Sequence, residues 1–110
     1  LYYYGQRWPA VHHTRMRLGC SKLNYDLCFN LRVIDRSTCR CGAQLENAHH
    51  YLIMCPLYQD HRIIMQRSVQ QVTNFNVNVL LYGDSNLSLD DNILVFQSVH
   101  KFIIDSNRFN

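Results

Sequence analysis

The sequence predicts a mainly α-helical fold, a small helical domain of four to five helices clasped by one structural zinc knuckle. Two observations lead to this prediction. Apolar residues recur at helical spacing in several segments, most clearly over residues 89–107. A group of cysteine and histidine residues lies between the second and third of these segments. With 110 residues the chain fits a single domain, residues 1–110, small enough to gain stability from a bound metal ion.

The first nine residues contain three tyrosines and Trp8. We expect residues 1–9 to form an aromatic strap packed on the domain, or a join to a preceding domain that this chain lacks. The sequence also begins without an initiator methionine. We therefore interpret it as the carboxyl-terminal part of a longer protein.

Two helices are expected before the cysteine cluster. The first covers residues 10–18 and stops at Gly19. The second covers residues 22 to about 31, with Ser21 as its N-cap. The residues expected to share a face are Val11, Arg15 and Leu18 in the first helix and Leu23, Leu27 and Leu31 in the second.

Residues 57–110 are expected to form a helical C-terminal tail. A helix over residues 57–72 is followed by a break at residues 73–76, where asparagines compete for backbone hydrogen bonds. Residues 77–82 form either a short helix or an extended piece, and a turn follows. The last helix covers residues 89–107, with Ser88 as N-cap and Asp91 in a capping box. Capping and the helix dipole explain Asp90 and Asp91 better than a metal site does.

The cysteines and histidines at residues 39–56 form the most informative pattern in the chain. It is Cys-x-Cys-x8-His-x4-Cys, with Cys39, Cys41, His50 and Cys55 as the candidate ligands. Three thiolates and one imidazole make a closed tetrahedral set, which suits one structural Zn²⁺ ion and leaves no open position for catalysis. The pattern therefore predicts a structural zinc knuckle.

The residues around these ligands also favour a metal. Gly42 allows the turn after Cys41 to direct amide groups toward the sulfurs. Pro56 disfavours helical geometry at Cys55, so a short helix carrying His50 should end there. Other residues of the same types provide weaker alternatives: His49 could replace His50, while Cys20, Cys28 and His61 are further candidates better explained by packing.

Positive charge is concentrated in the first part of the chain. Residues 1–42 contain seven Lys and Arg residues against two acidic ones, and residues 43–110 contain four against six. A basic segment leading into a zinc loop is typical of contact with nucleic-acid phosphates. The candidate phosphate contacts are Arg15, Arg17, Lys22, Arg32, Arg36 and Arg40. Tyr51 and Tyr58 could stack on unpaired bases, although packing in the core explains them better.

The sequence argues against several other classes of protein. Five cysteines exclude a fully paired disulfide framework within one chain, and reduced thiols indicate an intracellular protein of the nucleus or cytoplasm. We expect no membrane partner, because no stretch approaches the length of a membrane span. Cys55 and His50 could be a nucleophile and its base, but zinc uses them better. Without a phosphate-binding glycine loop or a nucleophile elbow, we expect no enzyme in this chain alone.

The motifs also resemble a known family. The runs at residues 15–24, 39–42 and 50–58, with Glu46 between them, are similar to the region downstream of the polymerase in non-LTR (LINE-type) retrotransposon polyproteins. Residues 81–84, 99–103 and 107–109 resemble the end of such polyproteins. The resemblance covers nearly the whole chain and is most specific in the cysteine and histidine part.

This resemblance implies a reverse-transcriptase zinc-binding domain, an accessory module that helps to hold RNA or target DNA beside the upstream polymerase domain. The ligands it implies are again Cys39, Cys41, His50 and Cys55. The polymerase's catalytic aspartates are not in the chain. Some relatives carry a nuclease with clustered acids and a lysine, but Asp84, Asp90 and Asp91 have no lysine close by in the sequence. The alternative function is a structural, protein-interacting domain that braces the polymerase.

Overall fold

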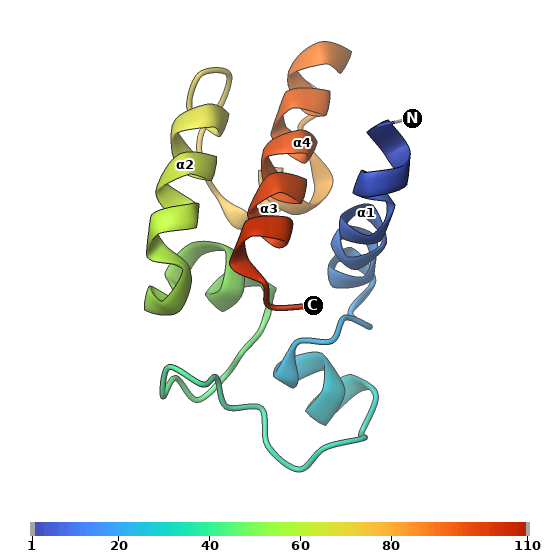
Figure 1. Ribbon diagram of the computed structural model, residues 1–110, viewed down its shortest axis with the longest axis vertical. Helices are drawn as coiled ribbons and strands as arrows, with labels where there is room; N and C mark the ends of the chain where they lie inside the picture. The colour runs from blue at the N-terminus through green and yellow to red at the C-terminus, as the bar shows by residue number, and fades with distance from the viewer. Residues whose placement is uncertain (1, 110) are drawn as a thin grey trace.

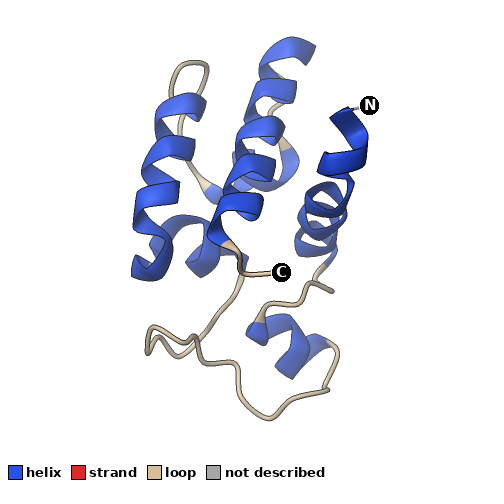
Figure 2. Cartoon of the chain, viewed as in Figure 1, coloured by secondary structure: helices blue, strands red, loops and turns tan. Residues whose placement is uncertain are grey.

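The computed structural model describes the backbone of residues 2–109 and the side chains of residues 7–109. These residues form helices and loops, without strands, so the prediction of a mainly helical fold is confirmed (Figures 1 and 2). Short helical turns are labelled η. In chain order the elements are α1 (Tyr2–Leu18), η1 (Asp26–Asn30), η2 (His50–Met54), η3 (Pro56–Tyr58), α2 (Gln59–Val69), α3 (Val77–Tyr82) and α4 (Leu89–Ser106).

Helix α4 is the central element and packs against α1, α2 and α3 (Figure 1). The Ser88 hydroxyl accepts a hydrogen bond from the amide of Asp91 at 3.1 Å, which confirms the predicted N-cap. The helix ends at Asn107, whose left-handed backbone (φ 58°) stops further helical turns. Its buried apolar residues, which form much of the core, are Val95, Val99, Phe102 and Ile103.

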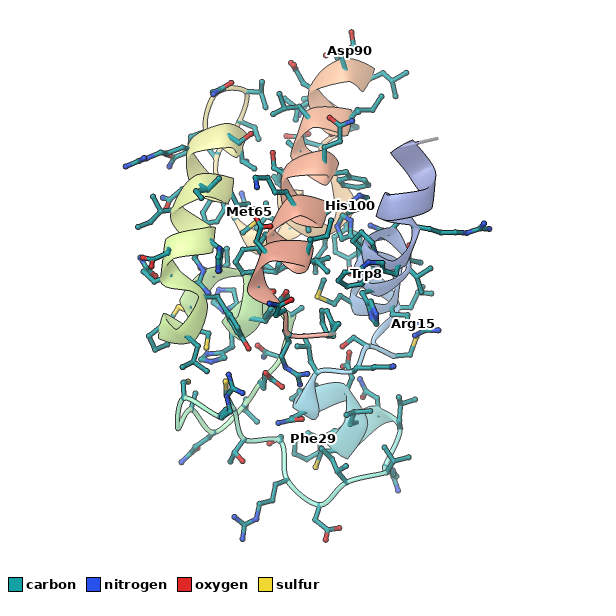
Figure 3. The ribbon with its side chains drawn as sticks, viewed as in Figure 1. Trp8, Arg15, Phe29, Met65, Asp90 and His100 are labelled. Carbon is teal, nitrogen blue, oxygen red and sulfur yellow. The ribbon has the colours of Figure 1, made fainter. Side chains whose placement is uncertain are left out.

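Helix α1 begins at Tyr2, so residues 2–9 are helical, and the predicted start at residue 10 is wrong. The tyrosine side chains of this segment lie outside the described residues. Pro9 lies inside the helix, although proline usually breaks one because it lacks an amide donor. Pro9 is fully buried and the neighbouring Trp8 packs against the core (Figure 3), and this burial offsets the lost hydrogen bond.

The buried face of α1 also differs from the prediction. Val11 is 40% exposed and Leu18 is 73% exposed, while His12, His13 and Met16 are buried. His13 is held by the rest of the fold, because its Nε2 donates to the carbonyl of Leu80 at 2.7 Å and its Nδ1 lies 3.0 Å from His100 Nε2. Polar anchors therefore set the orientation of α1 and override its apolar periodicity.

Two other predicted helices are shorter than expected. In the second segment, the buried Asp26 accepts hydrogen bonds from the amide and hydroxyl of Ser21, and the helical turn η1 covers only Asp26–Asn30. The helix expected over residues 57–72 is divided into η3 and α2, and residues 77–82 form the short helix α3, capped by Asn76. In the described part of the chain, no helix combines the length and apolar character needed to cross a membrane.

Candidate metal centre

Cys39, Cys41, His50 and Cys55 converge in the structure as the sequence pattern predicts. Their four ligand atoms all lie within 4.8 Å of one another. The sulfurs of Cys39 and Cys55 are 3.7 Å apart, and the sulfur of Cys41 lies 3.3 Å from Nε2 of His50. Two thiolates at 2.3 Å from a tetrahedral ion are themselves separated by about 3.8 Å. The cluster therefore has the spacing of a four-coordinate metal site.

The loop at residues 39–43 forms the first half of the cluster. Gly42 has a φ of +103°, and a Cβ added there would contact nothing, so it is this backbone conformation that favours glycine. The turn brings the amide of Cys41 to the sulfur of Cys39 and the amide of Ala43 to the sulfur of Cys41. Amide donors of this kind stabilise thiolates, as expected from the sequence.

The turn η2 supplies the second half of the cluster. Asn47 caps this segment by accepting a hydrogen bond from the amide of His50 at 2.8 Å. The turn ends at Met54, and Cys55 has an extended backbone (φ −65°, ψ 123°), as Pro56 requires. The cluster contains His50, whereas His49 is exposed and not part of it. Cys20, Cys28, His61 and Asp90 are also outside the cluster, which is the one such group in the described residues.

Burial governs the protonation of the candidate ligands. It raises the pKa of the Cys39 thiol to about 12 and also raises the pKa of Cys55. The pKa of Cys41 is lowered, mainly by the amide of Ala43. Burial lowers the pKa of His50, which keeps the imidazole neutral and able to bind a metal. A metal ion must displace the thiol protons, so its affinity for the cluster should depend strongly on pH.

Arg62 of α2 supports the cluster from behind and is a residue that sequence reasoning missed. Its side chain is 3% exposed, and its guanidinium donates to the carbonyl oxygens of Tyr51, Leu52 and Cys55 at 2.7–2.9 Å. These carbonyls lie at the C-terminal end of η2, where a cation is favourable. The position of Cys55 thus depends on a side chain from the next helix.

Glu46 and Arg108 form a second support, also without a role in the sequence analysis. The carboxylate of Glu46 is 2% exposed and accepts two hydrogen bonds from the Arg108 guanidinium, at 2.6 and 2.8 Å. It also accepts from the amide of Asn24 at 2.9 Å and lies 3.9 Å from the sulfur of Cys39. This ion pair joins the metal loop to the C-terminal residues that follow α4.

The structure separates the predicted phosphate contacts into groups. Burial lowers the pKa of His12, and the charges of Arg15 and Lys22 lower it further, so both cations lie near His12. Arg40 is exposed between two candidate ligands, and Arg32 and Arg36 are exposed in the preceding loop. Arg17 is engaged inside the fold: it donates to the carbonyl of Leu81 at 2.9 Å and lies over the ring of Phe96.

Tyr51 and Tyr58 are core residues. Tyr51 is fully buried and donates its hydroxyl proton to Ser106, which in turn donates to the carbonyl of Ile103. Tyr58 is 6% exposed, and its ring packs edge-on against Tyr51 and Phe102. The rings are covered by the core, which favours the packing interpretation over base stacking.

No family model, curated protein or solved structure matches the chain.

Proposed function

We propose that this chain is a zinc-stabilised accessory module that binds RNA or DNA within a retrotransposon reverse transcriptase polyprotein and is not catalytic by itself. The observation that carries the proposal is the convergence of three thiols and one imidazole within 4.8 Å. The family assignment depends on the sequence motifs described above. The nucleic-acid role depends on the exposed cations in the first part of the chain.

Zinc is the metal that this donor set suits best. Thiolates and imidazole are soft ligands, and a Cys₃His set with all four positions occupied by protein is typical of structural zinc. Three thiolates and Zn²⁺ together carry a charge of about −1, and the buried guanidinium of Arg62 lies directly behind Cys55. The charge of the loaded site is thereby compensated inside the fold.

Five cations remain for contact with phosphates. Arg40 projects from the metal loop, and the other candidates lie before it in the chain: Arg15, Lys22, Arg32 and Arg36. Their charges are not used by the ion pairs of the described residues, which join Lys101 to Asp105 and Arg108 to Glu46. Phosphate neutralisation by such residues supplies most of the affinity of non-specific nucleic-acid binding. Arg17 is left out of this set because its guanidinium serves the packing of α1.

The first experiment measures zinc in the purified, reduced protein and records circular dichroism before and after addition of a strong chelator. We expect about one zinc ion per chain and a loss of helix on chelation, because structural zinc contributes about 10–16 kcal/mol to small domains. A folded protein without zinc would contradict the metal assignment.

Binding of single-stranded RNA and DNA is then measured as a function of salt. The double variant Arg36→Ala with Arg40→Ala should weaken both and flatten the logarithmic salt dependence by about 0.7 for each lost contact. Arg67→Ala, which removes one exposed charge from α2, is the control for each of the two single variants. Unchanged binding in the double variant would remove these two arginines from the interface.

A second candidate function is contact with another protein, for example the polymerase that the resemblance places upstream. The specific observation is the exposed segment at residues 29–34, which covers the end of η1 and the start of the following loop (Figure 3). It contains four large apolar side chains with exposed fractions of 38–66%: Phe29, Leu31, Val33 and Ile34. This candidate predicts no affinity for single strands at about 0.1 M salt, where a phosphate site still registers.

A further inference from the structure

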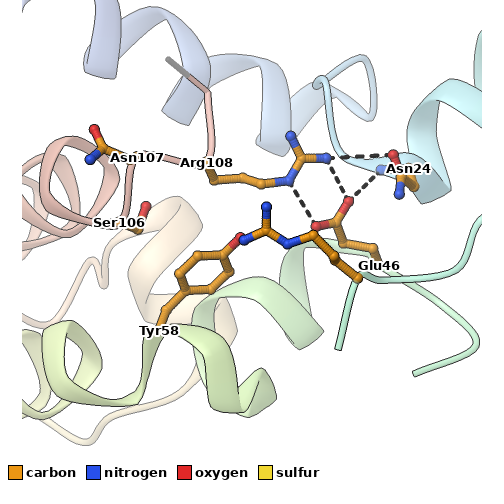
Figure 4. A pocket seen from close by; sticks show the side chains of 7 residues that line it. Asn24, Glu46, Tyr58, Ser106, Asn107 and Arg108 are labelled. Atoms are coloured by element: carbon orange, nitrogen blue, oxygen red, sulfur yellow. Dashed lines mark hydrogen bonds and ion pairs between the residues drawn. The ribbon is translucent and has the colours of Figure 1, made fainter. Parts of the chain in front are cut away.

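A polar pocket lies between the metal loop and the C-terminal residues (Figure 4). Its volume is about 430 Å³, and its lining includes Arg40, Glu46, Tyr58 and Arg108. Arg40 stands between two candidate metal ligands, and Tyr58 follows Cys55 by three residues. The metal centre therefore positions two sides of the pocket, and the end of the chain supplies a third.

The hydroxyl of Tyr58 is the first unusual feature of this pocket. The side chain is 94% removed from solvent, yet its hydroxyl makes no hydrogen bond with any described residue. The ring is fixed by Tyr51 and Phe102, and the hydroxyl end points toward the pocket (Figure 4). The oxygen is not among the enclosed polar atoms that lack a partner, so it meets the solvent of the pocket and is free to donate to a ligand there.

The charges of the pocket are the second feature. Glu46 is satisfied by Arg108 and by the amide of Asn24, so its carboxylate is neutralised where it stands. Arg40 makes no hydrogen bond or ion pair within the described residues. The pocket thus holds one uncompensated positive charge. Burial raises the pKa of Tyr58, while the charges of Arg108 and Arg40 oppose this rise, so both guanidinium groups lie near the hydroxyl.

We infer that this pocket binds a phosphate group, with the Arg40 guanidinium and the Tyr58 hydroxyl as donors and the Glu46–Arg108 pair as the charged wall. A guanidinium binds phosphate oxygens through two parallel hydrogen bonds, and a nearby hydroxyl satisfies a third oxygen. The pocket is larger than a phosphate group, which leaves room for an attached sugar. Where the phosphate belongs to a polynucleotide, the inference rests on the proposed function, and it then names one contact point of that interface.

The test uses the zinc-loaded protein and two probes, inorganic phosphate followed by amide chemical shifts and a labelled single-stranded 12-mer followed by fluorescence anisotropy. Two variants address the pocket. Tyr58→Phe removes one hydroxyl and keeps the buried ring, and Arg40→Gln removes the free charge. Matched controls are Tyr82→Phe, which changes an exposed tyrosine, and Arg67→Gln, which removes the same charge from α2. Circular dichroism and zinc content verify that each variant is folded and loaded.

We expect each pocket variant to weaken binding by about tenfold, as for loss of a hydrogen bond to a charged group, and each control to stay within about twofold. If the pocket variants bind both probes more weakly than wild type, the inference is supported, and the phosphate belongs to a polynucleotide. Phosphate binding that the pocket variants lose, without any oligonucleotide binding, supports the pocket with a free phosphate ester and contradicts the proposed function. Oligonucleotide binding equal in wild type and both pocket variants overturns the pocket and leaves the function standing. If the wild-type protein binds neither probe, both the pocket and the proposed function are overturned.

Discussion

The Nη1 atom of Arg62 lies 2.7 Å from the carbonyl oxygen of Cys55, so a buried guanidinium from α2 holds one end of the proposed metal centre. The same side chain donates to the carbonyls of Tyr51 and Leu52. A cation in this place satisfies the end of η2 and opposes the negative charge of the thiolates. Helix α2 and the metal site are therefore mechanically connected through one residue.

Replacing Arg62 by methionine tests this connection. Three buried carbonyls lose their donor, at about 1 kcal/mol or more each, so we expect the free energy of unfolding to fall by about 3 kcal/mol or more. Chemical denaturation of the zinc-loaded protein measures the change. Arg67→Met, on the exposed face of the same helix, should stay within about 0.5 kcal/mol of wild type. Equal stability of the two variants would show that Arg62 supports nothing.

Exchange of single cysteines tests the ligand set. Cys39→Ser removes a thiolate from the cluster and should weaken zinc binding by more than about 100-fold, beyond the effect typical of residues behind the ligands. Cys20→Ser changes a cysteine outside the cluster and should bind zinc like wild type. Competition with a chromophoric chelator measures both affinities.

The neighbouring histidines provide a second pair of variants for the same measurement. His50→Gln should lose zinc affinity and His49→Gln should retain it, because the cluster includes His50 alone of the two. Weakening by the His49 variant with full affinity in the His50 variant would reverse the assignment.

The Glu46–Arg108 pair should contribute far more than the exposed pair on α4. Removing one partner of a buried ion pair leaves an uncompensated charge and costs about 3–5 kcal/mol, so Glu46→Gln should be strongly destabilising. Lys101 Nζ lies 2.7 Å from Asp105 Oδ2, a similar distance, but these side chains are 61% and 30% exposed. Lys101→Gln should therefore cost no more than about 0.5 kcal/mol.

Double-mutant cycles for the two pairs separate pair coupling from the effects of each side chain alone. We expect coupling of about 2 kcal/mol for Glu46 with Arg108 and almost none for Lys101 with Asp105. Similar coupling in both cycles would mean that burial of Glu46 has no energetic consequence.

His13 should make stability depend on pH. Burial lowers its pKa from 6.5 to about 3, and the Leu80 carbonyl and the charges of Arg17 and His100 modify this effect. Between these two values the unfolded chain binds the proton and the folded chain does not. The stability that the neutral imidazole provides is therefore present above pH 6.5 and is lost as the pH falls toward 3, by about 2 kcal/mol between pH 7 and pH 5.

Acid also protonates the metal ligands, so the informative quantity is a difference between two proteins. His13→Gln keeps a donor for the Leu80 carbonyl and removes the titrating group. Denaturation at a series of pH values should give a shallower loss of stability for this variant than for wild type. Parallel curves would show that His13 does not titrate in the expected range.

Local sequence signals predicted much of this structure. The Ser88 cap and the apolar repeat of α4 act within a few residues, and the pairing of Cys39 with Cys55 follows from ligand spacing over a short segment. The face of α1 could not be predicted in this way. Val11 and Leu18 have the right periodicity, but His13 is buried because Leu80 and His100, far along the chain, supply its hydrogen bonds.

The residues that hold the candidate site in place also could not be predicted from local sequence. Arg62 looks like an ordinary charged residue on an amphipathic helix, and only the fold shows that it faces the carbonyls of η2. Glu46 and Arg108 both belong to motifs that the sequence singled out, but nothing in their spacing of 62 residues indicates a pair. Tyr58 is similar. Its ring could be expected in the core, but only the fold shows that its hydroxyl faces a pocket.

Two contacts close the chain around the candidate metal site, and their different sequence separations imply an order of folding. Cys39 and Cys55 are 16 residues apart along the chain, whereas Glu46 and Arg108 are 62 residues apart. Closing the shorter loop costs about 1 kcal/mol less chain entropy, and its four candidate ligands all lie at or before Cys55, while Arg62 follows to hold the Cys55 carbonyl. The four candidate ligands of a metal ion are therefore available while the second half of the chain is still emerging from the ribosome. The carboxylate of Glu46 gains its ion-pair partner, Arg108, only after this second half has been made.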